Sequence, residues 1–212
     1  MAVLQSQVQA ISRQAGGTPV NPGGTFGEAL FTELSPQYYT LIKQGKVFTV
    51  TAAAANPTAF TGGAAGTPLL GIYNPTTSGV DIVLLQARVG IRTTGTAAVS
   101  YDFAFWGAQQ GTTSPSGTQS LATNMYSLKT GGSVSYCMAN VANTGAAATS
   151  LIAPSFSGGL TAATAITNVA NLVDDIKGAI VIAPGGYLAY GATGSLTAAS
   201  LDVGLIWAEL PV

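Results

Sequence analysis

Alternation of apolar and polar residues over residues 79 to 107 is the feature that most constrains the fold of this chain. The stretch reads GVDIVLLQARVGIRTTGTAAVSYDFAFWG. Side chains two positions apart share a face of a strand, so the first half predicts one core face and one wet face. The alternation resumes after Thr93-Thr94-Gly95, which predicts a long β-hairpin. The expected core face of its first strand consists of Val83, Leu85, Ala87, Val89 and Ile91.

Similar strand patterns lie on both sides of this stretch. KVFTVTA (46–52) places Phe48 and Val50 on one face. GAIVIAPGGYLAYGATG (178–194) predicts two strands around a turn at Pro184-Gly185-Gly186. Further short strands are expected within 120–128, 133–141 and 148–156. In SLDVGLIWAEL (200–210) the residues that share the expected core face are Leu201, Val203, Leu205 and Trp207.

Only the segment from Ile166 to Ile176 departs from this pattern within the second half of the chain. Its apolar residues have helical spacing, which favours one short helix ending near Gly178, with a loop as the alternative. The remainder amounts to about eight to ten strands joined by short turns, the signature of a sandwich or jelly roll. We therefore predict an all-β fold, an antiparallel β-sandwich of jelly-roll type, over residues 44–212.

Residues 1 to 43 have a different character. Two stretches with helical spacing flank the Gly/Pro-rich sequence AGGTPVNPGGTFG (15–27), which cannot continue a helix. We interpret this segment as an N-terminal arm that either packs on its own domain or ties neighbouring subunits together. The residues expected to bind a partner are Leu4, Val8, Ile11, Phe26, Leu30, Phe31, Tyr38 and Tyr39.

Charged side chains make up only 7% of the chain, and the net charge is −1. A typical soluble protein has about 25% charged residues. Few charges mean little repulsion between copies, so close packing of identical subunits is favoured. With this net charge we expect neither a basic surface that would bind nucleic acid nor a polybasic segment that would attract the chain to a membrane. The N-terminus has no secretory signal pattern, and no apolar run has the length of a membrane span.

The sequence offers little for catalysis. Histidine is absent, which removes the commonest general base and metal ligand. The lone Cys137 is expected to be a small buried residue rather than a reactive thiol. Asp174 and Asp175 are adjacent and therefore diverge, so we expect a solvated turn, with an ion site or a hydrolase carboxylate as alternatives. We predict no catalytic residue, no metal, no cofactor and no small-molecule substrate.

Two further groups of side chains have both a structural and a binding interpretation. Arg88 and Arg92 share a strand face, where they could hold a carboxylate or a sugar acid. We favour instead a wet sheet face, or pairing with acids of a neighbouring subunit such as Asp81, Asp102 or Asp202. The aromatic residues expected in the core rather than in a sugar-stacking platform are Tyr101, Phe103, Phe105, Trp106, Tyr187, Tyr190 and Trp207.

Three segments carry a resemblance to a known group of proteins: ELSPQYYTLIKQGKVFTV (33–50), GIYNPTTSGVDIVLLQARVGI (71–91) and the ending IAPGGYLAYGATG…VGLIWAEL (182–210). With the arm and the strand-rich body, the chain resembles the structural proteins of tailed bacteriophages that decorate or cement the capsid. The resemblance implies a non-enzymatic virion protein on the capsid surface, a homotrimer bound to major capsid protein. The alternative is a carbohydrate- or receptor-binding module of a head fibre or tail.

Overall fold

The structure, a computed structural model, describes residues 38–55, 59–60, 68–93, 99–109, 119–139, 150–160, 171–194 and 199–212. By its contacts the chain divides into one unit of Met1–Thr40 and a second of Leu41–Val212. The short helix α2 (Tyr39–Lys43) spans this boundary. The strands that the described residues form all belong to the second unit.

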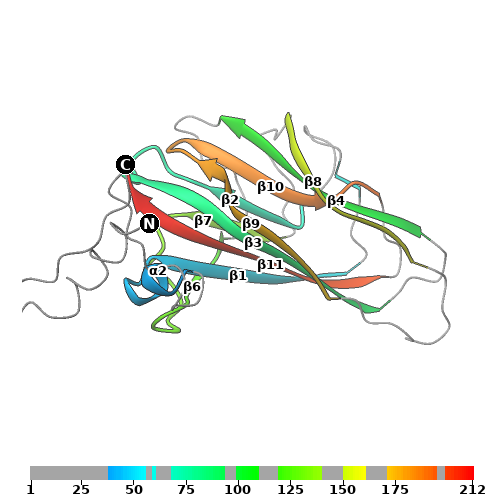
Figure 1. The fold of residues 1–212 in the computed structure, drawn as a ribbon. Coiled ribbons are helices and arrows are strands. Elements are labelled where there is room, and N and C mark those ends of the chain that lie inside the picture. The colour runs from blue at the N-terminus through cyan, green and yellow to red at the C-terminus, as the bar shows by residue number, and fades with distance from the viewer. Residues whose placement is uncertain are drawn as a thin grey trace, which may run out of the picture. The chain divides into compact units, whose positions relative to one another are not determined.

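These strands build two antiparallel sheets, which lie as two layers in Figure 1. The five-stranded sheet has the order β6-β1-β11-β3-β9, and the six-stranded sheet has the order β5-β7-β2-β10-β4-β8. The predicted antiparallel β-sandwich is thereby confirmed. The strand bounds are β1 (Val47–Ala55), β2 (Leu70–Tyr73), β3 (Val80–Thr93), β4 (Val99–Gln109), β5 (Gln119–Ser120), β6 (Thr123–Asn124), β7 (Tyr136–Ala139), β8 (Ser150–Leu160), β9 (Asn171–Ile182), β10 (Gly186–Ala192) and β11 (Ser200–Pro211).

The hairpin predicted over residues 79–107 is wrong, although both of its strands exist. Strand β3 pairs with β11 and β9, whereas β4 pairs with β10 and β8 in the other sheet. Each strand has an apolar face, and the two faces contribute to one core from opposite layers. Alternation specifies a buried face but not which strand lies alongside.

The turn at Pro184-Gly185-Gly186 also joins the two sheets. It connects β9 of the five-stranded sheet to β10 of the six-stranded sheet. The Gly186 amide donates to the Ala183 carbonyl over 2.8 Å, and Gly185 has a φ of 84°. Glycine adopts that left-handed conformation without a Cβ clash, so the turn predicted from the sequence is confirmed.

A β-bulge corrects the predicted core face of β3. Trp207 of β11 pairs with Leu84 while Ile206 pairs with Gln86, so Leu85 is an extra residue. The inward positions therefore change parity, from Ile82 and Leu84 before the bulge to Ala87, Val89 and Ile91 after it. Val83 was expected in the core but is only partly buried, because it precedes this shift.

The predicted core faces of β1 and β11 are confirmed. Phe48 and Val50 lie in the core with Leu201, Val203, Leu205 and Trp207. The rings of Phe48 and Trp207 stack with centroids 6.3 Å apart.

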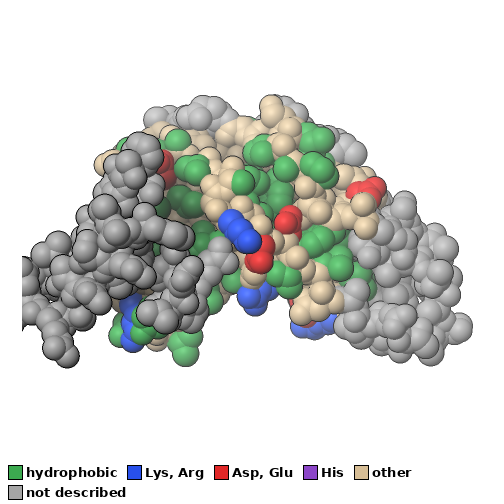
Figure 2. Space-filling model, viewed as in Figure 1, with side chains coloured by type: hydrophobic (Ala, Val, Ile, Leu, Met, Phe, Trp, Pro, Cys, Tyr) green, Lys and Arg blue, Asp and Glu red, His purple; other side chains and the backbone are tan. Residues whose placement is uncertain are grey.

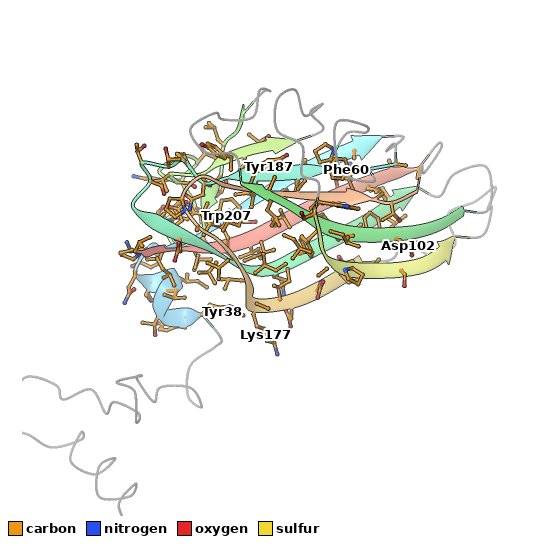
Figure 3. The ribbon with its side chains drawn as sticks, turned by 90° about the horizontal axis from the view of Figure 1, so that it is seen from above. Tyr38, Phe60, Asp102, Lys177, Tyr187 and Trp207 are labelled. Atoms are coloured by element: carbon orange, nitrogen blue, oxygen red, sulfur yellow. The ribbon has the colours of Figure 1, made fainter. Side chains whose placement is uncertain are left out.

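The aromatic residues of the six-stranded sheet divide between two clusters. Phe103, Phe105 and Tyr190 belong to the core between the sheets, together with Trp207. A second cluster contains Tyr73, Trp106 and Tyr187 with Phe60, whose ring meets that of Trp106 edge-on. Figure 3 labels Phe60, Tyr187 and Trp207. All of these rings are buried, as predicted, whereas the side chain of Tyr101 lies outside the described residues.

The prediction of a helix that ends near Gly178 is wrong for residues 171 to 178, the part that the structure describes. Residues 171 to 178 belong to β9, whose side chains alternate between partly buried and exposed. Leu172 and Ile176 pack against the core, whereas Val173 is exposed. Pairing with β3 stabilises the extended backbone here and overrides the local spacing. Residues 166–170 lie outside the described residues.

Asn74 ties the two sheets together at the end of β2. Its side-chain amide donates to the carbonyls of Val80 and Ile182, each over 2.8 Å. Its backbone amide donates to the Gly186 carbonyl, and its own carbonyl accepts from the Gly185 amide. Asn74 is fully buried. Since β2 and β10 belong to one sheet and β3 and β9 to the other, the two side-chain bonds connect the layers. The two backbone bonds fix Asn74 against the turn that leads into β10.

We expect Asn74→Ala to destabilise the fold by about 2 to 4 kcal/mol, because the buried Ile182 carbonyl loses this donor and the Val80 carbonyl loses one of two. The measurement is urea unfolding followed by tryptophan fluorescence. Ser78→Ala is the matched control, since the Ser78 hydroxyl also donates to the Val80 carbonyl, over 3.2 Å. It is expected to cost less than about 1 kcal/mol. Equal stabilities of the Asn74 variant and the wild type would contradict the role assigned to this side chain.

Candidate functional site

Two of the predicted partner-binding residues lie among the described residues. Tyr38 has a φ of 65°, and Tyr39 is 44% exposed. The other six, Leu4, Val8, Ile11, Phe26, Leu30 and Phe31, lie outside the described residues. Partner binding by the arm therefore stays a prediction.

A concave groove of about 390 Å³ lies on the outer face of the five-stranded sheet. Strands β1, β11, β3 and β9 supply its lining. The lining residues are Thr49, Thr51, Arg88, Gly90, Ile91, Arg92, Asn171, Asp202, Val203, Gly204 and Ile206. Its volume is within the range of small-ligand sites, about 300 to 1,000 Å³.

The groove arises from two glycines at outward-facing positions. Gly90 pairs with Asp202, and Gly204 pairs with both Arg88 and Thr51. A Cβ on Gly204 would come within 3.2 Å of the Thr51 methyl, whereas one on Gly90 would lie 3.7 Å from the Asp202 Cβ. Because glycine has no side chain, Gly90 and Gly204 leave a hollow between the longer side chains around them.

Hydrogen bonds hold the two arginines that border the groove. Gln86 donates through Nε2 to Asp175 Oδ1 and accepts through Oε1 from Arg88 Nε, over 2.6 Å. Arg92 forms a salt bridge through Nε with Asp202. The prediction that Arg88 and Arg92 share a wet sheet face is confirmed. The acid that pairs with Arg92 belongs to the same chain.

Asp174 and Asp175 diverge as predicted, but they lie in strand β9 rather than in a solvated turn. Asp174 accepts a bond of 2.7 Å from the Ser155 hydroxyl of β8, and Tyr190 donates to the same hydroxyl over 3.4 Å. Burial raises the pKa of the Tyr190 hydroxyl well above its ordinary value. Within the described ranges, histidine, cysteine and carboxylate side chains form no group of three suited to holding a metal ion.

Cys137 is buried, as predicted. Its sulfur lies 3.6 Å from the Ser135 hydroxyl. Desolvation raises the pKa of the thiol to about 12, with a smaller contribution from the negative charge of Glu209. The thiolate that a nucleophile or metal ligand needs is therefore strongly disfavoured in the folded protein.

The sequence did not single out the polar cluster around Glu209. This carboxylate is only 5% exposed and accepts hydrogen bonds from the Ser133 hydroxyl, the Val134 amide and Trp207 Nε1. These donors compensate for its burial. A lone acid in the apolar end of β11 was the available signal, but two of these donors, Ser133 and Val134, come from a segment some 75 residues away.

Among the residues that the structure describes, the two long strands β8 and β9 form an open edge of the sandwich. Each is the last strand of its sheet, and the Ser155–Asp174 bond connects them. The opposite edges end in strands of only two residues, β5 and β6. Large apolar side chains exposed along the open edge are Leu151 and Ile152 of β8 and Val173 and Val181 of β9.

No family model, curated protein or solved structure matches this chain. Among the residues that the structure places, none forms a helix with the length and apolarity needed to cross a membrane.

The buried thiol makes stability depend on alkaline pH. The unfolded thiol ionises near its ordinary pKa of 9.0 and the folded thiol near 12, so the unfolded state releases the proton first. Stability is therefore lost as pH rises from about 9 towards 12. We expect Cys137 to contribute a loss of about 1 kcal/mol at pH 10.

The measurement is the free energy of unfolding at pH 8 and pH 10 for the wild type and Cys137→Ala. The difference between the two proteins removes the contribution of other titrating groups. A pH dependence that is identical in both would contradict the burial of this thiol.

Proposed function

We propose that this chain is a non-enzymatic structural protein of a bacteriophage virion. In this proposal it decorates or cements the capsid surface by binding major capsid protein and copies of itself, as a homotrimer. The observation that carries the proposal is the open edge formed by β8 and β9, together with the low charge of the chain. Within the proposal we assign the sandwich to the jelly-roll type, since most consecutive strands lie in opposite sheets.

An unpaired strand edge is a template for another chain, and monomeric proteins usually blunt such edges. Strand β8 contains no charged residue over its eleven positions. It exposes 61% of Leu151, and β9 exposes 53% of Val181. Burying these side chains against a neighbouring copy would remove apolar surface from water.

Two features limit how a partner could use this edge. Pro154 in β8 lacks an amide donor, and β9 bulges around Lys177 and Gly178, which both have positive φ. A partner strand could not pair along the full length. We therefore propose side-chain packing around Leu151 and Val181 rather than a continuous sheet across subunits.

Low charge supports assembly over the wider surface. Figure 2 shows few charged side chains on the face in view, a small group of basic and acidic ones near its middle, among apolar and uncharged polar ones. Copies with few charges repel each other weakly, and desolvating their contacts costs less. The arm of residues 1–43 would add area by lying on a neighbour. A ligand that binds only the assembled capsid stabilises the assembled state.

The burial of the described aromatic side chains in β4, β10 and β11 favours this proposal over a sugar-stacking surface, although Tyr39 and Tyr126 are exposed. The rings that could have formed a platform, Trp106, Tyr187 and Trp207, are each less than 5% exposed. The groove on the five-stranded sheet is the observation that favours the second candidate, a carbohydrate- or receptor-binding module.

We expect the purified full chain to sediment as a trimer, and Leu151→Lys combined with Val181→Lys to sediment mainly as a monomer. Two cations facing each other across the contact would lose hydration without gaining a partner. Sedimentation velocity at several protein concentrations measures the change. Leu121→Lys is the matched control, because Leu121 is 63% exposed and lies outside β8 and β9.

Retention of the oligomer by the double variant would refute the open edge as the interface. A wild type that is monomeric at every concentration would refute self-association itself. Circular dichroism of each variant ensures that a monomer reflects a lost contact and not an unfolded chain.

A further inference from the structure

We propose that the groove on the outer face of the five-stranded sheet binds a saccharide that carries a carboxylate. This binding function is separate from the assembly surface at β8 and β9. The residues that carry it are Arg88, Arg92, Gln86, Asp202 and the glycines Gly90 and Gly204.

Arg88 is oriented before any ligand arrives. The side-chain amide of Gln86 donates a hydrogen bond from Nε2 to Asp175. This bond orients the Gln86 Oε1 towards Arg88 Nε, from which it accepts. A guanidinium held at Nε can direct its two terminal nitrogens, with four N–H donors, towards a ligand. This paired geometry matches the two oxygens of a carboxylate, and a fixed side chain loses less entropy on binding.

The opposite end of the groove offers acceptors as well as donors. Arg92 engages only one carboxylate oxygen of Asp202 through Nε. Asp202 Oδ1, the Asn171 amide and the Thr51 hydroxyl are groups in or beside this lining that can bond sugar hydroxyls. Arg92 lies four positions after Arg88 on β3, about 13 Å along the strand. That distance is longer than a single carboxylate group. It suits a longer ligand that carries hydroxyl groups as well.

The floor of the groove is backbone and apolar surface. Because Gly90 and Gly204 have no Cβ atoms, a sugar ring can approach the backbone of the sheet closely. Ile206 adds apolar surface at one end of the groove. The described residues of the lining include no aromatic side chain. A neutral sugar would therefore lack the stacking that usually holds it, and the arginine–carboxylate contact becomes the dominant interaction.

The charge of the lining argues against a nucleic acid. The described lining has two arginines and one aspartate, an excess of one positive charge, and Asp175 adds a negative charge beside Gln86. The whole chain has a net charge of −1. A phosphate backbone needs several cations along its path. One carboxylate is enough to balance this groove.

The test uses NMR titration of the full-length ¹⁵N-labelled protein with D-glucuronate, D-glucose and acetate. We expect saturable shifts of the Gly90 and Gly204 amides with glucuronate in the millimolar range. Glucose lacks the carboxylate and acetate lacks the ring, so each is expected to bind at least tenfold more weakly. Equal binding of glucose or of acetate would overturn the proposal, as would shifts that do not saturate or that avoid these glycines.

Three variants separate the parts of the site. Arg88→Gln is expected to weaken glucuronate binding at least tenfold, and Gln86→Leu, which keeps the charge but removes the orienting bond, several-fold. Gly90→Thr is expected to abolish binding by filling the floor, because a Cβ there has ordinary contacts and the fold can accept it. Leu121→Thr, at an exposed position outside both the groove and the β8–β9 edge, should bind as the wild type does.

Unchanged affinity in Arg88→Gln or in Gly90→Thr, with the fold intact by circular dichroism, would overturn the assignment. None of these outcomes depends on oligomer formation, so failure of this site and failure of the proposed assembly are distinguishable.

Discussion

The four hydrogen bonds of Asn74 fix the geometry on which the rest of the sandwich depends. Apolar packing between two sheets is strong but non-directional, so it does not by itself set how one sheet lies on the other. Asn74 links the ends of β2 and β9 and the starts of β3 and β10 through bonds of defined length and direction. The strands that carry the groove and the open edge, β3 and β9, are thus held in place at one end.

Strand β9 serves both surfaces that the proposals use. One face of β9 turns Asn171 towards the groove and Asp175 towards the Gln86–Arg88 pair, while its free edge runs beside β8. Figure 3 shows β9 and β8 along the same side of the sandwich. Among the described residues Arg92 and Asp202 form a salt bridge within the chain, and the low charge of the rest leaves mostly apolar and neutral polar surface for contact with other molecules.

The sequence predicted the sandwich because each strand buries one face against the other sheet, so its apolar residues recur at every second position. The sequence could not predict which strands pair. The alternation of apolar and polar residues in β3 and β4 is compatible both with a hairpin and with strands in opposite sheets. It could not predict the bulge at Leu85, where pairing with β11 and β9 shifts the parity and turns Val83 out of the core. Helical spacing before Gly178 failed for the same reason, because tertiary pairing overrides local pattern.

The groove was partly visible in the sequence. Arg88, Gly90 and Arg92 share one parity, and the option of a bound carboxylate followed from the two arginines. Gly204, Asp202 and Thr51 come from strands more than 30 residues away in the chain, and only the register of β1, β11 and β3 brings them together. The tie made by Asn74 was likewise hidden, since its sequence signal, Asn followed by Pro, indicates only a turn.

Electron cryo-microscopy of the virus particles whose genome encodes this chain tests the central claim most directly. The account predicts density for the β-sandwich on the outer capsid surface, at junctions between capsid proteins, with copies touching one another through β8 and β9. Particles that lack the protein, or that contain it only inside the shell, would contradict the account.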